Sequence, residues 1–330
     1  MTEARYLITI AIPTFNRCRL LKECLDSVIP QAEDDVEVLV SDNASIDGTS
    51  SMMAEYCRLN ACVRYLRNST NIGPDANYLQ CFRKSRGKYV HMLSDDDILL
   101  KGAVNAIKKR IKSQDNLAVL FLNNGSFVGS FGQTAIEPNY HLNSDLVFED
   151  KNDFLNFVNI EMTYLSSLIL NKEFTNQVNS PERYIGTSFL PSHLFLECLK
   201  HETPAAFIAH ICVAHRLDNV GKVGYDYYKV WALNYKDLIY GTGKSIGFRQ
   251  STLRNSYLKV LWRLGPSTIA FKSDKNKAKS FSNRKALIKG TWTYPISWIY
   301  IYPFAFSPPW LLNLLKRGGL SLLEFRERHM

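Results

Sequence analysis

The first hundred residues alternate between short apolar runs and amphipathic stretches of helical length, and this alternation restricts the fold more than any other feature. Residues 7–12, 36–40 and 63–66 are rich in β-branched and apolar side chains, as strands are. The stretch after the first run places its apolar residues on one helical face, at Leu21, Cys24, Leu25 and Val28. Strands that alternate with helices predict an α/β fold with a mostly parallel sheet flanked by helices.

A fourth apolar run, residues 87–93, leads into three consecutive carboxylates, Asp95, Asp96 and Asp97. Taken alone, aspartates after a strand are typical of a capped or solvated turn. Ligands of parallel sheets, however, bind beyond the carboxyl ends of the strands, and crowded carboxylates repel one another unless a cation neutralises them. Hard oxygen ligands of this kind suit Mg²⁺ or Mn²⁺, which also bind diphosphate oxygens.

The loops that follow the other strands carry polar and aromatic residues toward the same edge of the predicted sheet. These residues are Phe15, Asn16, Asp42, Asn43, Asn71 and Gly73. Several polar groups that converge on one crevice favour a ligand site over a capped turn.

Four segments in order resemble the signatures of family 2 glycosyltransferases: residues 10–17 (IAIPTFNR), 40–49 (VSDNASIDGT), 71–73 (NIG) and 93–97 (LSDDD). The resemblance implies a GT-A (Rossmann-like) fold, a nucleotide-sugar donor and a divalent metal, Mn²⁺ or Mg²⁺. It places the metal on Asp96 and Asp97, with Asp95 toward the donor sugar or ribose. The donor contacts that it implies are Pro13, Phe15, Asn16, Asp42, Asn71, Gly73, Asp95 and Asp96.

Within that set, Pro13, Phe15 and Asn16 would line the nucleobase and ribose pocket, and Asp42 would accept a hydrogen bond from the base or ribose. For Phe15 considered singly, a core aromatic residue is the better interpretation.

Deprotonation of an attacking hydroxyl requires a general base, which many inverting members of the family supply as an acidic pair near residues 184–199. This chain has no such pair there, and His193 is the nearest group with a suitable ordinary pKa. We therefore assign catalytic roles to His193 and Asp95. A histidine satisfied on a helix face is the alternative for His193, while Glu161 and Asp145 are weaker candidates. A retaining reaction without a dedicated base also stays open.

Two further motifs are interpreted as structural. Residues 241–245 (GTGKS) lack the first glycine of a phosphate loop, since Leu238 stands there, and are predicted to be a turn. His210, Cys212 and His215 have metal-ligating side chains, but no fourth ligand is evident, and this segment is predicted to be a strand.

The chain divides by composition into a catalytic domain, residues 1–225, and a helical, aromatic and basic appendage, residues 226–330. Residues 249–330 contain fifteen Lys and Arg against three Asp and Glu, a net +12 in a chain of +9.

Residues 292–312 interleave Trp, Tyr and Pro, and the prolines exclude a straight membrane-spanning helix. Aromatic residues beside lysines are typical of a membrane-interface segment that binds anionic lipid. A hydrophobic subdomain or a dimer contact is the alternative.

The seven cysteines show no CxxC spacing, and no secretory signal precedes the first strand. Reduced thiols of this kind indicate the cytoplasm. We therefore expect the protein to associate peripherally with the inner face of the plasma membrane.

The expected function is the transfer of a hexose from a nucleotide-diphosphate sugar to a hydroxyl of a lipid-linked glycan, in bacterial surface polysaccharide (O-antigen) synthesis. The chain also resembles abequosyltransferase-like enzymes, which would imply a deoxyhexose. Two other classes stay open. A nucleotidyltransferase acting on sugar phosphates needs a glycine- and lysine-rich loop after the first strand, which residues 13–17 lack. A nucleic-acid-binding protein would account for the basic tail, although we expect no nucleic acid partner.

Overall fold

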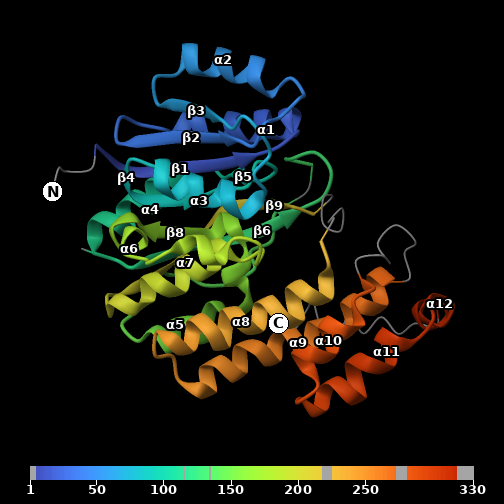
Figure 1. Ribbon diagram of the computed structural model, residues 1–330. Coiled ribbons are helices and arrows are strands. Elements are labelled where there is room, and N and C mark those ends of the chain that lie inside the picture. The colour runs from blue at the N-terminus through green and yellow to red at the C-terminus, as the bar shows by residue number, and fades with distance from the viewer. Residues whose placement is uncertain (1–4, 115, 134, 218–224, 273–280, 318–330) are drawn as a thin grey trace. The chain divides into compact units, whose positions relative to one another are not determined.

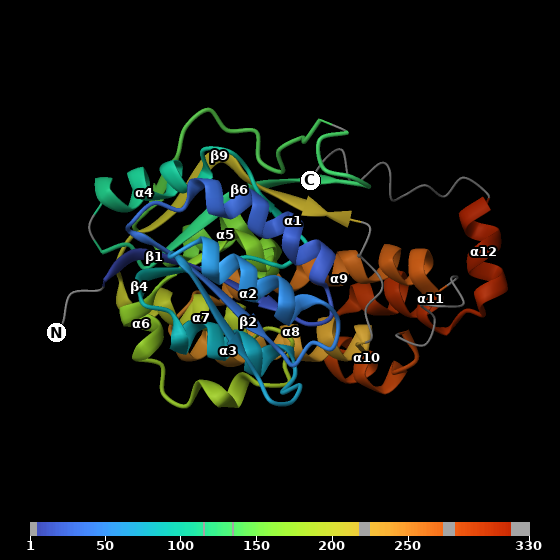
Figure 2. The same cartoon turned by 90° about the horizontal axis from the view of Figure 1, so that it is seen from above.

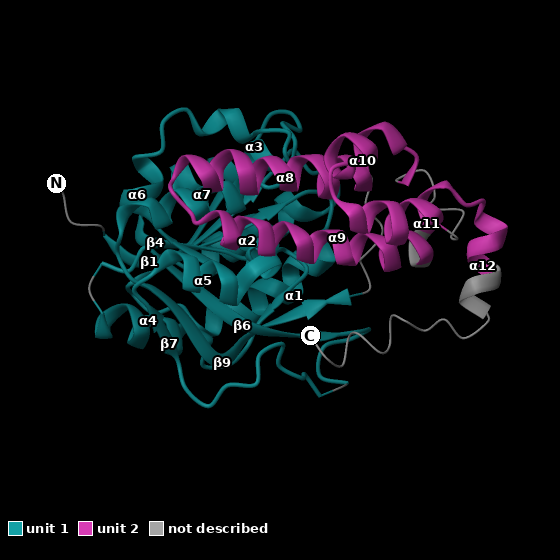
Figure 3. Cartoon of the chain, turned by 90° about the horizontal axis from the view of Figure 1, so that it is seen from below, with its two compact units in different colours: residues 1–218 teal, residues 219–330 magenta. Residues whose placement is uncertain are grey.

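The computed structural model describes residues 5–114, 116–133, 135–217, 225–272 and 281–317. The chain forms two compact units, residues 1–218 and residues 219–330, which are coloured separately in Figure 3. Each unit is described by itself below.

Unit 1 is built on a nine-stranded sheet with the order β3-β2-β1-β4-β8-β6-β9-β5, and β7 pairs with β9 (Figure 1). Strands β1 to β4 pair in parallel, as the alternation predicts, whereas β8 runs antiparallel to both β4 and β6. The α/β class is confirmed, but the sheet is mixed, because β5, β7 and β8 run antiparallel to their neighbours. The strands are β1 (Tyr6–Thr14), β2 (Val36–Asp42), β3 (Val63–Arg67), β4 (Gly87–Met92), β5 (Ile98–Leu99), β6 (Val119–Phe127), β7 (Leu146–Phe148), β8 (Leu168–Asn171) and β9 (Ala205–Arg216).

Helices cover both faces of this sheet (Figure 2). The apolar sides of α1 (Cys18–Val28), α2 (Thr49–Leu59) and α4 (Ala103–Ser113) pack against one face. The opposite face is covered by α3 (Pro74–Lys84), α6 (Lys172–Asn176) and α7 (Leu190–Cys198). A further helix, α5 (Lys151–Val158), follows β7.

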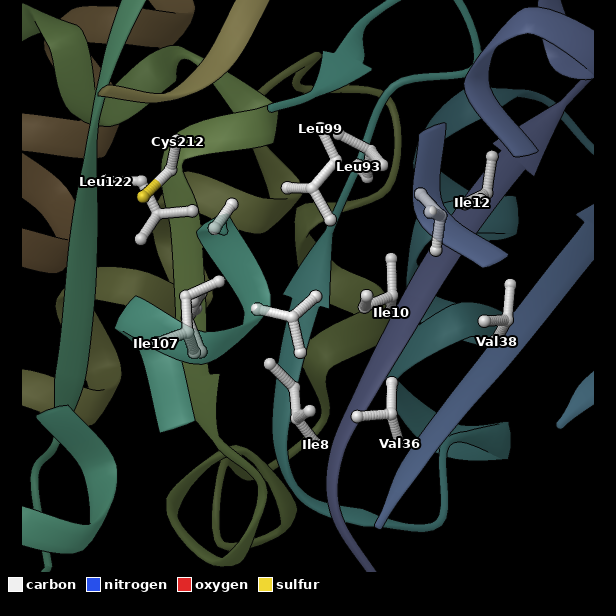
Figure 4. Close-up of a cluster of buried hydrophobic side chains, with 14 of the residues drawn as sticks. Ile8, Ile10, Ile12, Val36, Val38, Leu93, Leu99, Ile107, Leu122 and Cys212 are labelled. Atoms are coloured by element: carbon white, nitrogen blue, oxygen red, sulfur yellow. The ribbon is translucent and has the colours of Figure 1, made fainter. Parts of the chain in front are cut away.

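The core of unit 1 lies between β1, β2 and the helices of the first face. Ile8, Ile10 and Ile12 of β1 lie beside Val36 and Val38 of β2, and each is at most 1% exposed (Figure 4). Every residue of β1 from the third onward is buried, because helices cover both faces of the strand. The continuous apolar runs of the sequence therefore mark the sheet correctly.

One strand begins later than the pattern predicts. The apolar pattern of residues 165–170 (LSSLIL) is typical of a strand, but Leu165–Ser167 forms a 3₁₀ turn and β8 begins at Leu168. This turn matters for the site, because it brings Ser166 next to the end of β4.

Unit 2 is helical in the part that the structure describes. Its elements are the π-helix Lys229–Asn234, α8 (Tyr235–Asp237), the π-helix Leu238–Gly243, α9 (Gln250–Lys272), α10 (Arg284–Thr291), the π-helix Ser297–Ile301, α11 (Tyr302–Phe306) and α12 (Pro309–Arg317).

Two buried side chains hold these helices together through backbone carbonyls. Tyr257 donates to the carbonyls of Ala232 and Gly290. Lys272, at the end of α9, donates to the carbonyls of Ala305 and Ser307 at 2.7 and 2.6 Å. These contacts fix α10 and α11 within the unit.

Residues 241–245 are helical, so the turn predicted there is wrong, and no strand precedes them as a phosphate loop would require. Among the described residues, no helix combines the length and the hydropathy needed to cross a membrane.

Candidate active site

Asp95 lies just beyond the end of β4 and is held from two sides. Its Oδ2 accepts a hydrogen bond of 2.7 Å from the Thr14 hydroxyl at the end of β1, and its Oδ1 lies 2.9 Å from Nη1 of Arg17. Burial raises the pKa of Asp95 to about 6; the Arg17 charge opposes this rise, and the neighbouring Asp96 charge adds to it. The raised pKa thus reflects desolvation first, and a nearby cation would favour the ionised form of this buried carboxyl.

Asp97 is fully buried, and both of its oxygens are occupied. Oδ2 accepts from the hydroxyls of Tyr164 and Ser166 at 2.8 and 2.6 Å. Oδ1 lies 3.1 Å from Nδ1 of His215 and accepts from the backbone N–H of Arg216 at 3.1 Å. Asp97 therefore links the loop after β4 to the 3₁₀ turn before β8 and to the end of β9.

Burial alone would lower the pKa of His215, but the hydrogen bond and charge of Asp97 raise it above its ordinary value. The sequence interpretation of residues 208–212 as a strand is confirmed by β9. His215, at the end of that strand, meets Asp97 across the sheet edge, a partner that could not be inferred from local spacing.

The Arg216 side chain holds the aspartate loop in place. Its Nε donates to the carbonyl of Asp96 at 3.1 Å, and its Nη1 donates to the carbonyl of Gly129 at 2.7 Å. Its second terminal nitrogen forms an ion pair with Glu23 of α1, and the guanidinium lies over the ring of Phe127. One buried side chain thus joins α1, the aspartate loop and the segment after β6.

The other residues predicted to bind a donor lie on the neighbouring loops of the same edge. Asp42, at the end of β2, is fully buried; it accepts from the Ser45 N–H at 2.9 Å and from the Tyr65 hydroxyl at 2.5 Å, and Nε of Arg67 lies 3.7 Å away. Asn16, with a positive φ of 53°, accepts from the N–H of Ile46. These contacts tie the loop after β1 to the loop after β2.

The Asn43 side chain likewise joins the loop after β2 to the loop after β3 by hydrogen bonds. Its amide nitrogen donates to Oδ1 of Asn71 at 2.8 Å, and its own Oδ1 accepts from the N–H of Ile72 at 2.9 Å. Gly73 then takes a φ of 84° at the start of α3, a conformation that favours glycine. The predicted polar residues therefore brace the loops, while three large apolar side chains on these loops stay exposed: Phe15 at 41%, Ile46 at 89% and Ile72 at 43%.

The structure places the candidate base His193 in the interior. It lies on α7, whose nine residues are all buried, and its ring stacks on Tyr184 with centroids 4.1 Å apart. Burial, together with the Arg183 charge, lowers the pKa of His193 to about 3. A fully buried imidazole cannot meet an acceptor hydroxyl in this conformation, so the geometry favours the core interpretation. Catalysis by His193 has not been tested.

The two weaker candidates differ in their surroundings. Asp145 forms an ion pair with Arg110 at 2.8 Å and accepts a hydrogen bond from the Ala209 N–H, so its carboxylate has a structural role. Glu161 is half-buried in the 3₁₀ turn Asn159–Thr163, and its charge contributes to raising the pKa of His215. Of the residues considered for the base, Glu161 is thus within electrostatic reach of the acid cluster.

The buried state of His193 predicts a pH effect on stability. Its pKa is about 3 in the folded protein and 6.5 ordinarily, so the folded state binds fewer protons and stability falls as pH drops below 6.5. The loss approaches about 1.4 kcal/mol per pH unit for one group. We expect His193→Gln to show a smaller fall in the urea midpoint between about pH 7 and about pH 5 than the wild type shows. His210→Gln, at an exposed position, is the control. A variant with an unchanged pH profile and no turnover would instead support the catalytic role.

Within the described part of the chain, no three His, Cys, Asp or Glu side chains are arranged so that they could hold a metal ion. The chemistry of the donor set nevertheless fits a hard divalent cation, because a single Arg17 nitrogen already bridges the carboxylates of Asp95 and Asp96 at 2.9 and 3.1 Å. A positive charge thus lies beside Asp96, one of the two aspartates on which the resemblance places the metal.

The chain is similar to known glycosyltransferases in sequence and in fold. The family model described as "Glycosyl transferase family 2" matches residues 9–164. Abequosyltransferase RfbV of Salmonella typhimurium is 31% identical over 221 residues, covering 62% of this chain and 64% of RfbV. A GalNAc(5)-diNAcBac-PP-undecaprenol beta-1,3-glucosyltransferase of Campylobacter jejuni is 28% identical over 182 residues, covering 52% of this chain and 55% of that enzyme. The matches thus span less than two thirds of each relative.

Among solved structures, residues 1–349 of S. aureus TarS in complex with UDP-GlcNAc superpose with a TM-score of 0.61 at 14% identity, covering 86% of this chain and 79% of that chain. At this identity the likeness concerns the fold. The matched residues 9–164 include β1 to β4 and the aspartates of the sheet edge. Residues 9–164 of this chain therefore match the family 2 glycosyltransferases, and the fold is of the GT-A type.

Proposed function

We propose that the protein is a metal-dependent glycosyltransferase that moves a hexose from a nucleotide-diphosphate sugar to a hydroxyl of a lipid-linked glycan, in the synthesis of a bacterial surface polysaccharide such as O-antigen. The observation that carries the proposal is the single sheet edge on which the loops after β1, β2 and β3 are hydrogen-bonded to one another beside the aspartates after β4. The likeness to an abequosyltransferase supports a deoxyhexose as the sugar.

In this proposal the donor lies over the braced loops. Phe15 and Ile72, both exposed, give the nucleobase an apolar surface, and Pro13, Asn16, Asn71 and Gly73 shape the loops around it. Asp42 accepts a hydrogen bond from the base or ribose of the nucleotide sugar, through a carboxylate that also contacts Tyr65 and Arg67. Asp95 faces the donor sugar or ribose.

Mn²⁺ or Mg²⁺ would be held by Asp96 and Asp97, and His215 lies beside Asp97, with Nδ1 3.1 Å from Oδ1. When bound, the metal supplies positive charge against the departing diphosphate. The chain's own residues position the groups: Thr14 orients Asp95, and Tyr164 and Ser166 orient Asp97.

The experiment that tests the proposal is a thermal-shift screen of UDP, GDP, CDP and dTDP with Mn²⁺. A nucleotide present at a hundredfold excess over its dissociation constant stabilises the protein by about 2.7 kcal/mol. Stabilisation by one nucleoside diphosphate, together with hydrolysis or sugar transfer when the corresponding nucleoside diphosphate sugar is supplied, supports the proposal. Stabilisation only by a nucleoside triphosphate with a sugar phosphate would favour a nucleotidyltransferase instead.

The proposed membrane partner rests on a strip of aromatic side chains in unit 2. Trp298 donates from its indole N–H to the carbonyl of Trp292, and its ring contacts Tyr302. Tyr302 in turn contacts Phe306, over which the guanidinium of Arg284 lies. We name the four aromatic residues, Trp292, Trp298, Tyr302 and Phe306, the aromatic strip.

Apart from the buried Tyr302, the aromatic strip is exposed, and it lies in a segment without Asp or Glu. Trp292 is 57% exposed and Trp298 is 60% exposed, and Ile299 beside them is 80% exposed. Residues 275–323 contain no Asp or Glu, while Lys285 and Lys289 are exposed. Exposed Trp next to Lys and Arg matches an anionic bilayer interface, where the rings lie at the level of the lipid headgroups. We propose that the protein binds the inner face of the plasma membrane in this way.

We expect the double variant Trp298→Ser, Ile299→Ser to bind vesicles of neutral and anionic phospholipid at least about tenfold more weakly, because each lost apolar side chain removes roughly 1.5–3 kcal/mol of burial. Co-sedimentation at low salt is the measurement. Leu59→Ser, which changes a side chain on α2 that is 61% exposed, is the matched control.

Unchanged vesicle binding would rule out the aromatic strip as the anchor. A variant that loses self-association rather than vesicle binding would identify a dimer contact. Equal binding of the wild type to single-stranded DNA at the same salt would favour a nucleic-acid-binding protein.

A further inference from the structure

Arg17 lies across the two outer aspartates of the acid cluster. Its Nη1 is 2.9 Å from Oδ1 of Asp95 and 3.1 Å from Oδ2 of Asp96. The Arg17 side chain is 44% exposed, whereas those of Asp95 and Asp96 are 5% and 12% exposed. The guanidinium therefore covers the solvent side of the two carboxylates, and one of its nitrogens occupies a position that a small cation could take.

The inner side of the cluster is already filled. Asp97 accepts hydrogen bonds on both oxygens from the interior, and Oδ2 of Asp95 accepts from Thr14. On Asp96, Oδ1 accepts from the hydroxyl of Ser94 at 2.6 Å. The other oxygen of Asp96, Oδ2, faces Arg17, so a cation that binds Asp96 from solvent must displace Arg17.

Arg17 belongs to the same loop as the proposed donor contacts Phe15 and Asn16. It directly precedes α1, and its backbone is not helical, with φ −137° and ψ 39°. A guanidinium keeps its charge at all working pH values and binds phosphate oxygens with two parallel hydrogen bonds. A short movement of this side chain would thus exchange carboxylate partners for phosphate partners.

We propose that Arg17 is the resident counter-ion of the acid cluster in the donor-free protein, and that it moves from Asp95 and Asp96 to the donor diphosphate when a divalent metal binds the aspartates. This inference rests on the proposed function for the identity of the diphosphate. It has a thermodynamic consequence. A metal alone competes with Arg17 and binds weakly, whereas a diphosphate gives Arg17 another partner, so metal and diphosphate favour each other's binding.

The test is Mn²⁺ binding, followed by electron paramagnetic resonance of the free ion, with and without inorganic pyrophosphate. For the wild type we expect pyrophosphate to tighten Mn²⁺ binding, within the roughly 5- to 150-fold range of such couplings. For Arg17→Gln we expect Mn²⁺ alone to bind about tenfold more tightly, and pyrophosphate to have little further effect. Arg17→Lys keeps the charge, so its affinity for Mn²⁺ alone should stay near that of the wild type.

Arg19→Gln is the matched control, because Arg19 is 85% exposed and pairs with Glu23 on the surface of α1. An affinity of Arg17→Gln for Mn²⁺ equal to or weaker than that of the wild type would overturn the inference. That result together with normal sugar transfer would leave the proposed function intact. Tighter Mn²⁺ binding by Arg17→Gln without turnover of any nucleotide sugar by the wild type would instead refute the function and keep the counter-ion role.

Discussion

Asp96→Asn is expected to lower sugar transfer about 10²- to 10³-fold, the loss seen when one preorganised electrostatic group is removed from an active site. Its melting temperature should stay close to that of the wild type. The Asp96 side chain is 12% exposed, and its partner Arg17 is 44% exposed. The loss of such an ion pair costs roughly 0–1 kcal/mol of stability.

The measurement is nucleoside diphosphate release from the donor that the nucleotide screen identifies. Asp34→Asn, an exposed carboxylate before β2, controls for a change in net charge. Normal turnover of Asp96→Asn would remove this residue from the metal and donor site.

The second large effect is expected for the replacement of Asp97, which should lower stability as well as activity. Asp97→Ala leaves the hydroxyls of Tyr164 and Ser166, the ring of His215 and the N–H of Arg216 without their buried acceptor. Removing one partner from such a buried charged network costs about 3–5 kcal/mol.

Urea unfolding at neutral pH is the measurement, with Asp34→Ala as the control. Asp97→Asn keeps one acceptor oxygen and should fall between the wild type and Asp97→Ala. An Asp97→Ala variant as stable as the wild type would mean that these donors find other acceptors, and that Asp97 acts on the metal alone.

Much of the fold could be predicted from periodicity. The strands β1 to β4 follow from apolar runs that both faces of the sheet bury, and the position of the aspartates follows from the end of β4. Local pattern is sufficient for β1 to β3, because β2 pairs with β1 and β3 through short crossovers, whereas β4 returns to pair with β1 from farther along the chain. The mixed half of the sheet could not be predicted in the same way, since β8 and β9 pair with strands far away in the sequence.

The partners of the aspartates illustrate the same limit. Tyr164 and Ser166 reach Asp97 from 67 and 69 residues away. No local motif marks them. Arg17, in contrast, directly follows Asn16 within the first signature, so its nearness to the cluster could have been expected from the sequence alone.

The burial of individual polar side chains could not be predicted from the sequence pattern either. The roles predicted for Asp42 in donor binding and for His193 as a base need accessible groups, yet both side chains are fully buried. For His193 a signal was available, because residues 194–196 (LFL) beside it are apolar on every face of the turn. For Asp42 the deciding partner, Tyr65, lies on the next strand.

The strand order also bears on the order of folding. Strand β1 pairs with β2, and β2 with β3, across short sequence separations, whereas β4 pairs with β1, and β9 with β6, across much longer ones. Long loop closures slow folding, and we expect pulse-labelled hydrogen exchange to protect β1 and β2 before β9. Because β9 supplies His215 and Arg216 to Asp97, a growing chain that has not reached residue 216 carries the donor loops without a closed acid cluster.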